Sequence, residues 1–154
     1  MTNFLQIFYN LPGQWAIYRT INNKLDNILS GTVNGNAIFL PIKDDEIYYK
    51  EEGIFITTNN HRFNISKEYI YLYNHRKQTI EKYFAKNQVR TDLFYKIPIN
   101  DFNTCSASHQ CNNDLYIAKY YFIYGTKLDK FVLTYQVNGP LKNYLSTTQY
   151  LKSN

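Results

Sequence analysis

The sequence has little cysteine and no hydrophobic stretch long enough to cross a membrane. Two cysteines in 154 residues do not make a disulfide framework, so we expect reduced thiols and a cytoplasmic location. No uninterrupted run of about 18 apolar residues occurs, so no transmembrane helix is expected. Residues 1–18 have no basic start, and Gln6, Asn10 and Gln14 interrupt their apolar residues. These features argue against a secretory signal.

The motifs of several common enzyme classes are also missing. Glycine-rich phosphate loops, the nucleophile elbow and the HExxH metal motif do not occur. The net charge is +5, but there is no long basic run, so nucleic acid is not indicated as a partner. The sequence indicates no cofactor, and it does not define the oligomeric state.

Aromatic residues, in contrast, are abundant. They make up 18% of the chain, with 16 Tyr and 10 Phe, and such residues favour pleated, half-buried surfaces. A helical pattern over 2–10 ends at Pro12 and Gly13, and alternation of apolar and polar residues then begins. This alternation predicts strands over 15–21, 31–40, 47–57, 61–74 (whole or broken), 78–86, 92–97, 114–124, 131–137 and 144–152 (strand or short helix). We expect residues 98–113, which contain both cysteines, to form a long polar loop.

About nine short strands with hairpin-length links predict an all-β, antiparallel fold with a short N-terminal helix. No long helices separate the strands, which argues against a parallel sheet. Closure into a barrel would remove the exposed edges of such a meander. We therefore expect one domain over 1–154, an up-and-down barrel of about 8–10 strands, with a two-sheet sandwich as the alternative. A barrel of this size holds one small ligand or is filled by side chains.

Five fragments together carry a family resemblance. They are LPGQW at 11–15 with Arg19, GTVNGNA at 31–37 with Phe39, YYKEEG at 48–53, HQCNNDLY at 109–116 and VNGPLKNY at 137–144. This set resembles DUF6314, a mainly bacterial family catalogued as a domain of unknown function. The Gly-x-Trp element also resembles the opening of lipocalin-type (calycin) barrels. The resemblance implies a lipocalin-like fold, and it supplies no catalytic residues.

Two charged residues are candidates for the barrel interior. Arg19 shares a strand face with Trp15, and an inward arginine needs an anionic partner. Glu51, which shares a face with Tyr49 and Gly53, is the expected partner. The resemblance to lipocalin-like barrels implies that Trp15 lies at the closed end of the barrel, beneath a basic side chain.

A second candidate cluster combines His109, Cys111, Asp114 and Tyr116. These residues could simply anchor a loop through hydrogen bonds. They could also bind a ligand or do chemistry, since histidine titrates near neutral pH and a cysteine beside it can act as a nucleophile. With Cys105 they supply enough ligand atoms for a metal, but the spacing matches no zinc signature, so no metal site is predicted.

The strand over 114–124 and the turn after it add further candidates. Tyr116, Tyr120 and Phe122 lie on one face, which would give the barrel flat walls and hydroxyl groups. Lys142 follows a Gly-Pro turn, and it could reach solvent or hold an anionic group near the opening.

We therefore expect the barrel to bind a small, partly hydrophobic, anionic ligand. Trp15 and Phe122 would form its wall or floor, and the polar contacts would be Arg19, Glu51, His109, Asp114, Tyr116, Tyr120 and Lys142. One alternative is an enzyme in which His109 is the general acid or base, Asp114 orients it and Tyr116 or Lys142 assists. Another is a protein-interaction module with a filled barrel and an exposed apolar patch. The sequence does not decide whether the protein is an enzyme.

Overall fold

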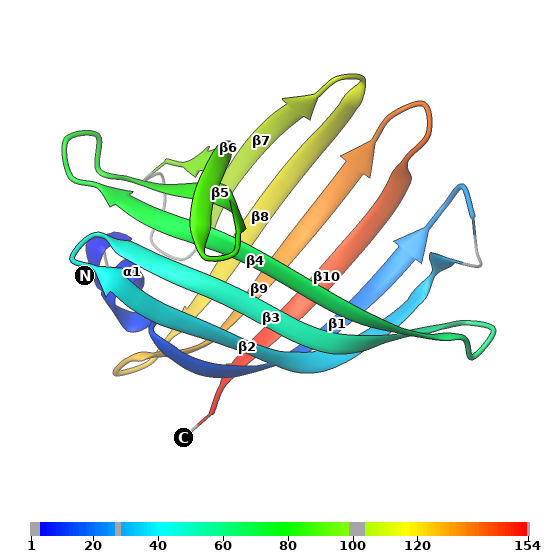
Figure 1. The fold of residues 1–154 in the computed structure, drawn as a ribbon, viewed down its shortest axis with the longest axis horizontal. Coiled ribbons are helices and arrows are strands. Elements are labelled where there is room, and N and C mark those ends of the chain that lie inside the picture. Colours follow the sequence, from blue (N-terminus) through cyan, green and yellow to red (C-terminus); the bar gives the residue numbers. More distant parts are fainter. Residues whose placement is uncertain (1–3, 27–28, 99–103, 154) are drawn as a thin grey trace.

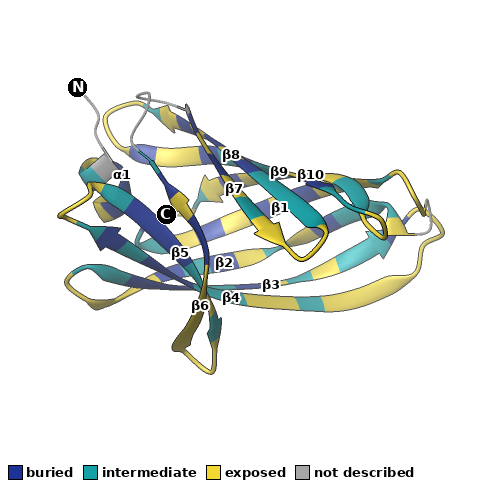
Figure 2. Cartoon of the chain, turned by 90° about the horizontal axis from the view of Figure 1, so that it is seen from above, coloured by how far each residue is buried: buried dark blue, intermediate teal, exposed yellow. Residues whose placement is uncertain are grey.

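The predicted alternation is present in the computed structural model, whose described residues are 4–26, 29–98 and 104–153. In the first strand, every second side chain from Trp15 to Arg19 is buried and those between are exposed. Figure 2 shows the same alternation of buried and exposed residues along other strands. The elements in chain order are α1 (Phe4–Asn10), β1 (Gly13–Asn23), β2 (Gly31–Lys43), β3 (Glu46–Thr57), β4 (Arg62–Asn74), β5 (Thr79–Lys86), β6 (Val89–Ile97), β7 (Thr104–Cys111), β8 (Asp114–Tyr124), β9 (Leu128–Asn138) and β10 (Asn143–Lys152).

The ten strands form one antiparallel sheet that curls into a nearly closed barrel (Figure 1). The strand order is β6-β5-β4-β3-β2-β1-β10-β9-β8-β7, so β1 pairs with β10 and the meander closes there. β6 and β7 end this order and approach each other, but no hydrogen-bonded ladder joins their described residues. The prediction of an up-and-down barrel with a short N-terminal helix is confirmed.

One sequence-based expectation was wrong. Within residues 98–113, expected as a polar loop, residues 104–111 form β7, which pairs with β8 and contains both cysteines. The buried positions of β7 are filled by the small residues Cys105 and Ala107, so the strand shows no run of large apolar side chains. Of the two segments with open alternatives, 61–74 is one continuous strand from Arg62 onward (β4), and 144–152 lies in strand β10. The helix expected over 2–10 is α1, and residues 2 and 3 lie outside the described ranges.

Helix α1 covers one end of the barrel. Its residues Ile7 and Phe8 are buried, and Leu11 continues the plug against Trp15, which has 0% exposed surface. The Trp15 indole Nε1 donates to the Leu11 carbonyl at 2.9 Å, and the Lys152 ammonium lies 5.4 Å from the ring centre. The expected basic side chain over Trp15 is therefore Lys152. In the described ranges, no helix has the length and apolar character needed to span a membrane.

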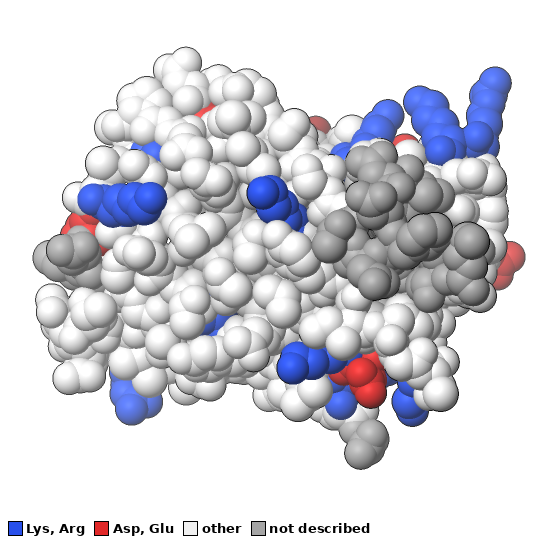
Figure 3. Space-filling view, turned by 180° about the vertical axis from the view of Figure 1, so that it is seen from behind, with Lys and Arg blue, Asp and Glu red and all other residues white. Residues whose placement is uncertain are grey.

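Packing inside the barrel changes along its axis. Near α1 the interior is filled, because the rings of Trp15, Phe39, Phe131 and Tyr150 contact one another. Toward the β7–β8 and β9–β10 hairpins, charged side chains and tyrosine hydroxyls replace these rings. On the outside, the face opposite to that in Figure 1 carries Lys and Arg at several separate places (Figure 3). The candidate functional groups are therefore sought in the polar half of the interior.

Candidate functional site

An ion pair on the inner face of the barrel joins β1 and β3, the two strands that flank β2. Arg19 and Glu51 point inward, and only 6% and 1% of their surfaces are exposed. The Arg19 nitrogens Nη1 and Nη2 donate to Glu51 Oε2 and Oε1 at 2.7 and 2.9 Å, and Nε donates to Thr148 Oγ1 at 2.6 Å. The Tyr49 hydroxyl donates to Glu51 Oε1 at 2.6 Å. Both charges are thus compensated inside the barrel, and the pairing predicted from the sequence is present.

The pair keeps both partners charged. Burial alone would raise the pKa of Glu51, but the hydrogen bonds and charge of Arg19 outweigh it and lower that pKa below its usual 4.5. Burial also opposes the charge on Arg19, and Glu51 reverses this effect, so the pKa of Arg19 is raised. Glu51 is therefore an ionised carboxylate whose two oxygens are already engaged.

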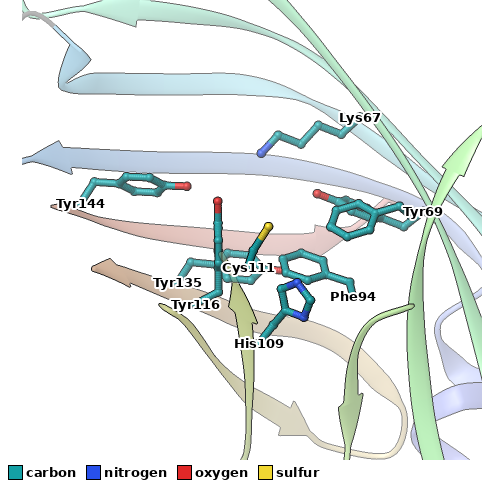
Figure 4. A pocket seen from close by; sticks show the side chains of 9 residues that line it. Lys67, Tyr69, Phe94, His109, Cys111, Tyr116, Tyr135 and Tyr144 are labelled. Atoms are coloured by element: carbon teal, nitrogen blue, oxygen red, sulfur yellow. The ribbon is translucent and has the colours of Figure 1, made fainter. Parts of the chain in front are cut away.

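A cavity of about 220 Å³ opens beyond this pair, at the end of the barrel away from α1 (Figure 4). Strands β4 to β10 all contribute to its wall, and six of its nine lining residues are Tyr or Phe. The Phe84 and Phe94 rings stack with centroids 4.5 Å apart, and the Phe94 and Tyr135 rings are nearly parallel at 6.0 Å. The lining residues are Lys67, Tyr69, Phe84, Phe94, His109, Cys111, Tyr116, Tyr135 and Tyr144.

Lys67 is the cationic side chain of this wall. It lies opposite Glu51 in the β3–β4 ladder, yet no carboxylate of the described residues is within salt-bridge distance of its ammonium. The Lys67 side chain is exposed as a whole, at the open end of the barrel, but its ammonium is turned toward the cavity (Figure 4). Loss of water around the ammonium and the positive charge of Arg19 lower the pKa of Lys67 below its usual 10.5, while the charge of Glu51 opposes this shift. Figure 4 shows the Lys67 ammonium, the Tyr116 and Tyr144 hydroxyls and the Cys111 sulfur directed toward one space. That space therefore faces a cation and several polar groups.

A second polar group lies at the rim of the cavity. The Lys142 ammonium donates to the Tyr116 hydroxyl at 2.9 Å and lies 3.8 Å from the Asp114 carboxylate. Lys142 remains half exposed, and its pKa is raised by the hydrogen bond to Tyr116 and by nearby negative charge. This group links the turn after β9 to β8, and it places a second cation beside the opening.

The structure brings only part of the predicted set together. His109 and Tyr116 line the cavity, and Asp114 and Lys142 join Tyr116 at its rim. Arg19 and Glu51 are neighbours in the interior but do not line the cavity. The predicted residue Tyr120 and the wall or floor residues Trp15 and Phe122 are buried in the filled part, outside the cavity lining.

His109 contacts aromatic rings rather than Asp114. Its ring centre lies 5.3 Å from that of Phe94 in an edge-on arrangement and 6.3 Å from that of Tyr116. Among the described residues, no hydrogen bond or ion pair joins His109 to Asp114, whose carboxylate faces Lys142. The hydrogen bond that an acid–base pair of these two residues would need is therefore not formed.

Sequence reasoning missed Lys67 and the tyrosines of β9 and β10 that complete the cavity. Lys67 has the same parity as Tyr69 and Tyr71, which were recognised as one strand face, so extending that face by one position would have found it. Lys82 was also missed, although it is buried and separates Ile80 from Phe84 on the same alternating face of β5. A lysine inside an apolar face goes against the usual rule for charged residues.

No metal centre forms from the candidate ligands. Within residues 4–26, 29–98 and 104–153, no group of three or more His, Cys, Asp or Glu side chains is arranged to hold a metal ion. Cys105 is buried in the barrel and Cys111 is exposed, and both are free thiols. Burial raises the pKa of Cys105 to about 12, so its thiol is protonated at neutral pH.

Comparison with known proteins places this barrel in context. The S-type phycobiliprotein lyase CPES from Guillardia theta superposes with a TM-score of 0.71 at 8% identity, covering 99% of this chain and 94% of the lyase. The redesigned β-barrel mFAP1, bound to DFHBI, gives a TM-score of 0.42 at 12% identity, and the match covers 96% of this chain and 99% of the redesigned barrel. No curated protein matches the chain in sequence. The family model of DUF6314, a family of unknown function, matches residues 11–152, and the chain therefore belongs to this family.

Proposed function

We propose that the barrel binds a small organic anion with a flat, partly hydrophobic body, and that the acidic group of this ligand pairs with Lys67. The observation that carries the proposal is the Lys67 ammonium, which faces a cavity of about 220 Å³ and has no carboxylate partner among the described residues. A ligand carboxylate would supply the missing counter-ion. It would also favour the charged form of Lys67, whose pKa is lowered in the free protein.

The balance of charge inside the barrel supports an anionic ligand. Lys67 is near enough to Arg19 and Glu51 to be influenced by both charges. Because Arg19 already neutralises Glu51, the remaining positive potential is not compensated by the described interior residues. Charges of one sign in a cleft with low-dielectric walls attract ligands of the opposite sign.

The shape of the wall supports a flat body for the ligand. Phe94 stacks on Phe84 and is nearly parallel to Tyr135, so the cavity presents planar faces. The Tyr116 and Tyr144 hydroxyls stand among these faces and provide hydrogen-bonding groups for polar substituents. The alternative of a protein-interaction module with a filled barrel fits less well, because the half of the barrel away from α1 contains this cavity. An enzyme that uses His109 and Asp114 lacks their mutual hydrogen bond.

The phycobiliprotein lyase supports the proposal only through its fold. At 8% identity none of its residues is carried over to this chain, and the cavity argument stands on the side chains described above. We further propose a cytoplasmic location, because Cys105 and Cys111 are both free thiols, as expected in a reducing compartment.

Calorimetric titration with 2-naphthoate and its neutral analogue 2-naphthamide tests the proposal. Both probes are flat, and they differ in the charge that Lys67 is proposed to bind. We expect the wild-type protein to bind the carboxylate at least about tenfold more tightly, which corresponds to ~1.4 kcal/mol. In Lys67→Met this preference is expected to disappear.

Lys119→Met is the matched control, since Lys119 is an exposed lysine of β8 that lies outside the cavity lining. This variant should keep the wild-type preference for the carboxylate. Equal affinities for the two probes in the wild type, or an unchanged preference in Lys67→Met, would contradict the proposal.

A further inference from the structure

Lys82 is a buried lysine that the proposed anion site does not use. It belongs to β5, points into the barrel and keeps only 2% of its surface exposed. Its ammonium nitrogen lies 4.0 Å from the ring centre of Tyr69, and four further rings surround it at 5.2–5.8 Å. These four rings belong to Tyr71, Phe94, Tyr95 and Tyr135.

Among the residues that the structure describes, the nitrogen of Lys82 has one hydrogen-bond partner and no ion-pair partner. Its hydrogen-bond partner among the described residues is the Tyr135 hydroxyl at 2.8 Å, and no described carboxylate forms an ion pair with it. An ammonium group has three N–H donors to satisfy, whereas a neutral amine is satisfied by fewer contacts. Burial lowers the pKa of Lys82 well below its usual 10.5; the charge of Glu51 opposes this shift, and the charges of Lys67 and Arg19 add to it. A neutral amine carries a free lone pair.

The amine lies directly behind the wall of the cavity. Tyr69, Phe94 and Tyr135 belong both to the cage around Lys82 and to the cavity lining. Tyr69 is half-buried, and access from the cavity to the nitrogen would require a change of its side-chain rotamer while Tyr135 keeps its hydrogen bond to Lys82. A group at the inner end of a bound ligand would then meet Lys82.

A chain of tyrosine hydroxyls leads away from the amine. The Tyr135 hydroxyl, which contacts Lys82, forms a hydrogen bond with the Tyr95 hydroxyl at 2.6 Å, and Tyr95 is in turn hydrogen-bonded to Tyr120. Hydroxyls both donate and accept, so Tyr135 can give a proton to a reacting atom and take one back. The chain thus places a proton donor and acceptor beside a nucleophilic nitrogen.

We propose that Lys82 is a reactive amine that forms an imine with an aldehyde group of a ligand held in the cavity. The nitrogen lone pair attacks the carbonyl carbon, and the electron pair of the C=O π bond moves to oxygen. Tyr135 donates a proton to that oxygen and recovers one from the nitrogen, which gives a carbinolamine. Tyr135 then donates a proton to the hydroxyl, which leaves as water while the nitrogen lone pair forms the C=N bond. The remaining N–H proton returns to Tyr135, so amine and aldehyde become imine and water. Only the delivery of an anionic aldehyde rests on the proposed function.

Reductive trapping at neutral pH tests this proposal. The protein is incubated with 4-formylbenzoate and cyanoborohydride, which reduces an imine to a stable secondary amine, and the modified lysines are mapped by mass spectrometry. Lys82 should be modified at least about tenfold faster than exposed Lys119, because each unit by which a pKa is lowered raises the neutral fraction tenfold. Lys82→Met should lose this adduct, and Lys119→Met should retain it.

Modification spread evenly over exposed lysines, or directed to Lys67 instead of Lys82, would overturn the proposal. Benzaldehyde, which has no carboxylate, separates this proposal from the anion site. If Lys82 reacts with benzaldehyde as fast as with 4-formylbenzoate, the amine is reactive and the anion site fails. If 2-naphthoate binds through Lys67 but neither aldehyde modifies Lys82, the anion site stands and the imine proposal fails.

Discussion

Arg19 and Glu51 form a bidentate ion pair inside the barrel, with nitrogen–oxygen distances of 2.7 and 2.9 Å. This pair prevents Lys67 from forming an ion pair with Glu51. Lys67 lies opposite Glu51 across the β3–β4 ladder, but both Glu51 oxygens are engaged by Arg19, and one also accepts from Tyr49. The lysine therefore keeps its charge available to the cavity, which is why the proposed anion site would depend on a pair that does not line the cavity.

Replacing Arg19 with methionine should destabilise the protein by roughly 3–5 kcal/mol, because Glu51 would remain buried without its partner. Urea unfolding of the wild type and Arg19→Met measures this loss. The double variant Arg19→Met/Glu51→Met should recover most of it, since the uncompensated charge is removed as well. A single variant as stable as the wild type would contradict the structural role assigned to the pair.

Stability should fall at acidic pH through Glu51. Its folded-state pKa is lowered below 4.5, so the stability it contributes is present above that value and is lost as pH falls through the folded-state pKa. Unfolding free energies measured between pH 7 and pH 3 should show the wild type losing its advantage over the Arg19→Met/Glu51→Met variant. A difference between the two that is independent of pH would count against a depressed pKa.

Lys82→Met should stabilise the protein at neutral pH by roughly 1–3 kcal/mol, the scale for a poorly satisfied buried polar group. Burial lowers the folded-state pKa of Lys82, so the unfolded chain binds more protons between that pKa and the ordinary 10.5. The stability of the wild type relative to Lys82→Met should therefore rise with pH in this window. Urea unfolding at pH 7 and pH 10 measures the difference in unfolding free energy between Lys82→Met and the wild type. This gap should be smaller at pH 10. A gap that widens would show that Lys82 is charged in the fold.

The two thiols should react very differently. Cys111 is exposed and lines the cavity, whereas Cys105 is buried and burial raises its pKa to about 12. Iodoacetamide should alkylate Cys111 and leave Cys105 unmodified in the folded protein, as read by peptide mass spectrometry. Saturating 2-naphthoate should slow the alkylation of Cys111. Equal labelling of both thiols, or no protection by the carboxylate, would be inconsistent with the cavity described here.

Gly35 should resist substitution more than Gly125. Gly35 pairs with Gly53 where β2 and β3 approach closely, and a Cβ at Gly35 would overlap the Glu52 carbonyl oxygen and come within 2.7 Å of Gly53 Cα. We expect Gly35→Ala to cost roughly 1–3 kcal/mol, as overpacking does. Gly125 has open space around it, so Gly125→Ala serves as the control and should change the melting temperature little. Similar melting temperatures for the two variants would refute this account.

Most of the barrel could be predicted because its strands carry a clear alternation of inward and outward residues. β7 escaped notice because its buried positions hold Cys105 and Ala107, which are too small to mark an apolar face beside serines and a histidine. The pairing of Arg19 with Glu51 followed from the need of a buried arginine for a counter-ion.

The cavity was harder to anticipate, because its wall combines residues from seven strands that are far apart in the sequence. Lys67 belonged to a recognised strand face, but its lack of a carboxylate partner depends on three-dimensional competition with Arg19 for Glu51. Asp114 is close to His109 in the sequence, yet its carboxylate faces Lys142. Closeness in the sequence therefore predicted that His109 and Asp114 lie near the cavity rim, but not which side chains they contact.

A crystal structure of the protein with 2-naphthoate is the most direct test of the central claim, that this cavity binds organic anions through Lys67. The account predicts the naphthalene rings inside the cavity, in contact with the aromatic walls at Phe94 and Tyr135, with the carboxylate in salt-bridge contact with the Lys67 ammonium. Density for the probe only on the outer surface, or inside the cavity with its carboxylate turned away from Lys67, would contradict it.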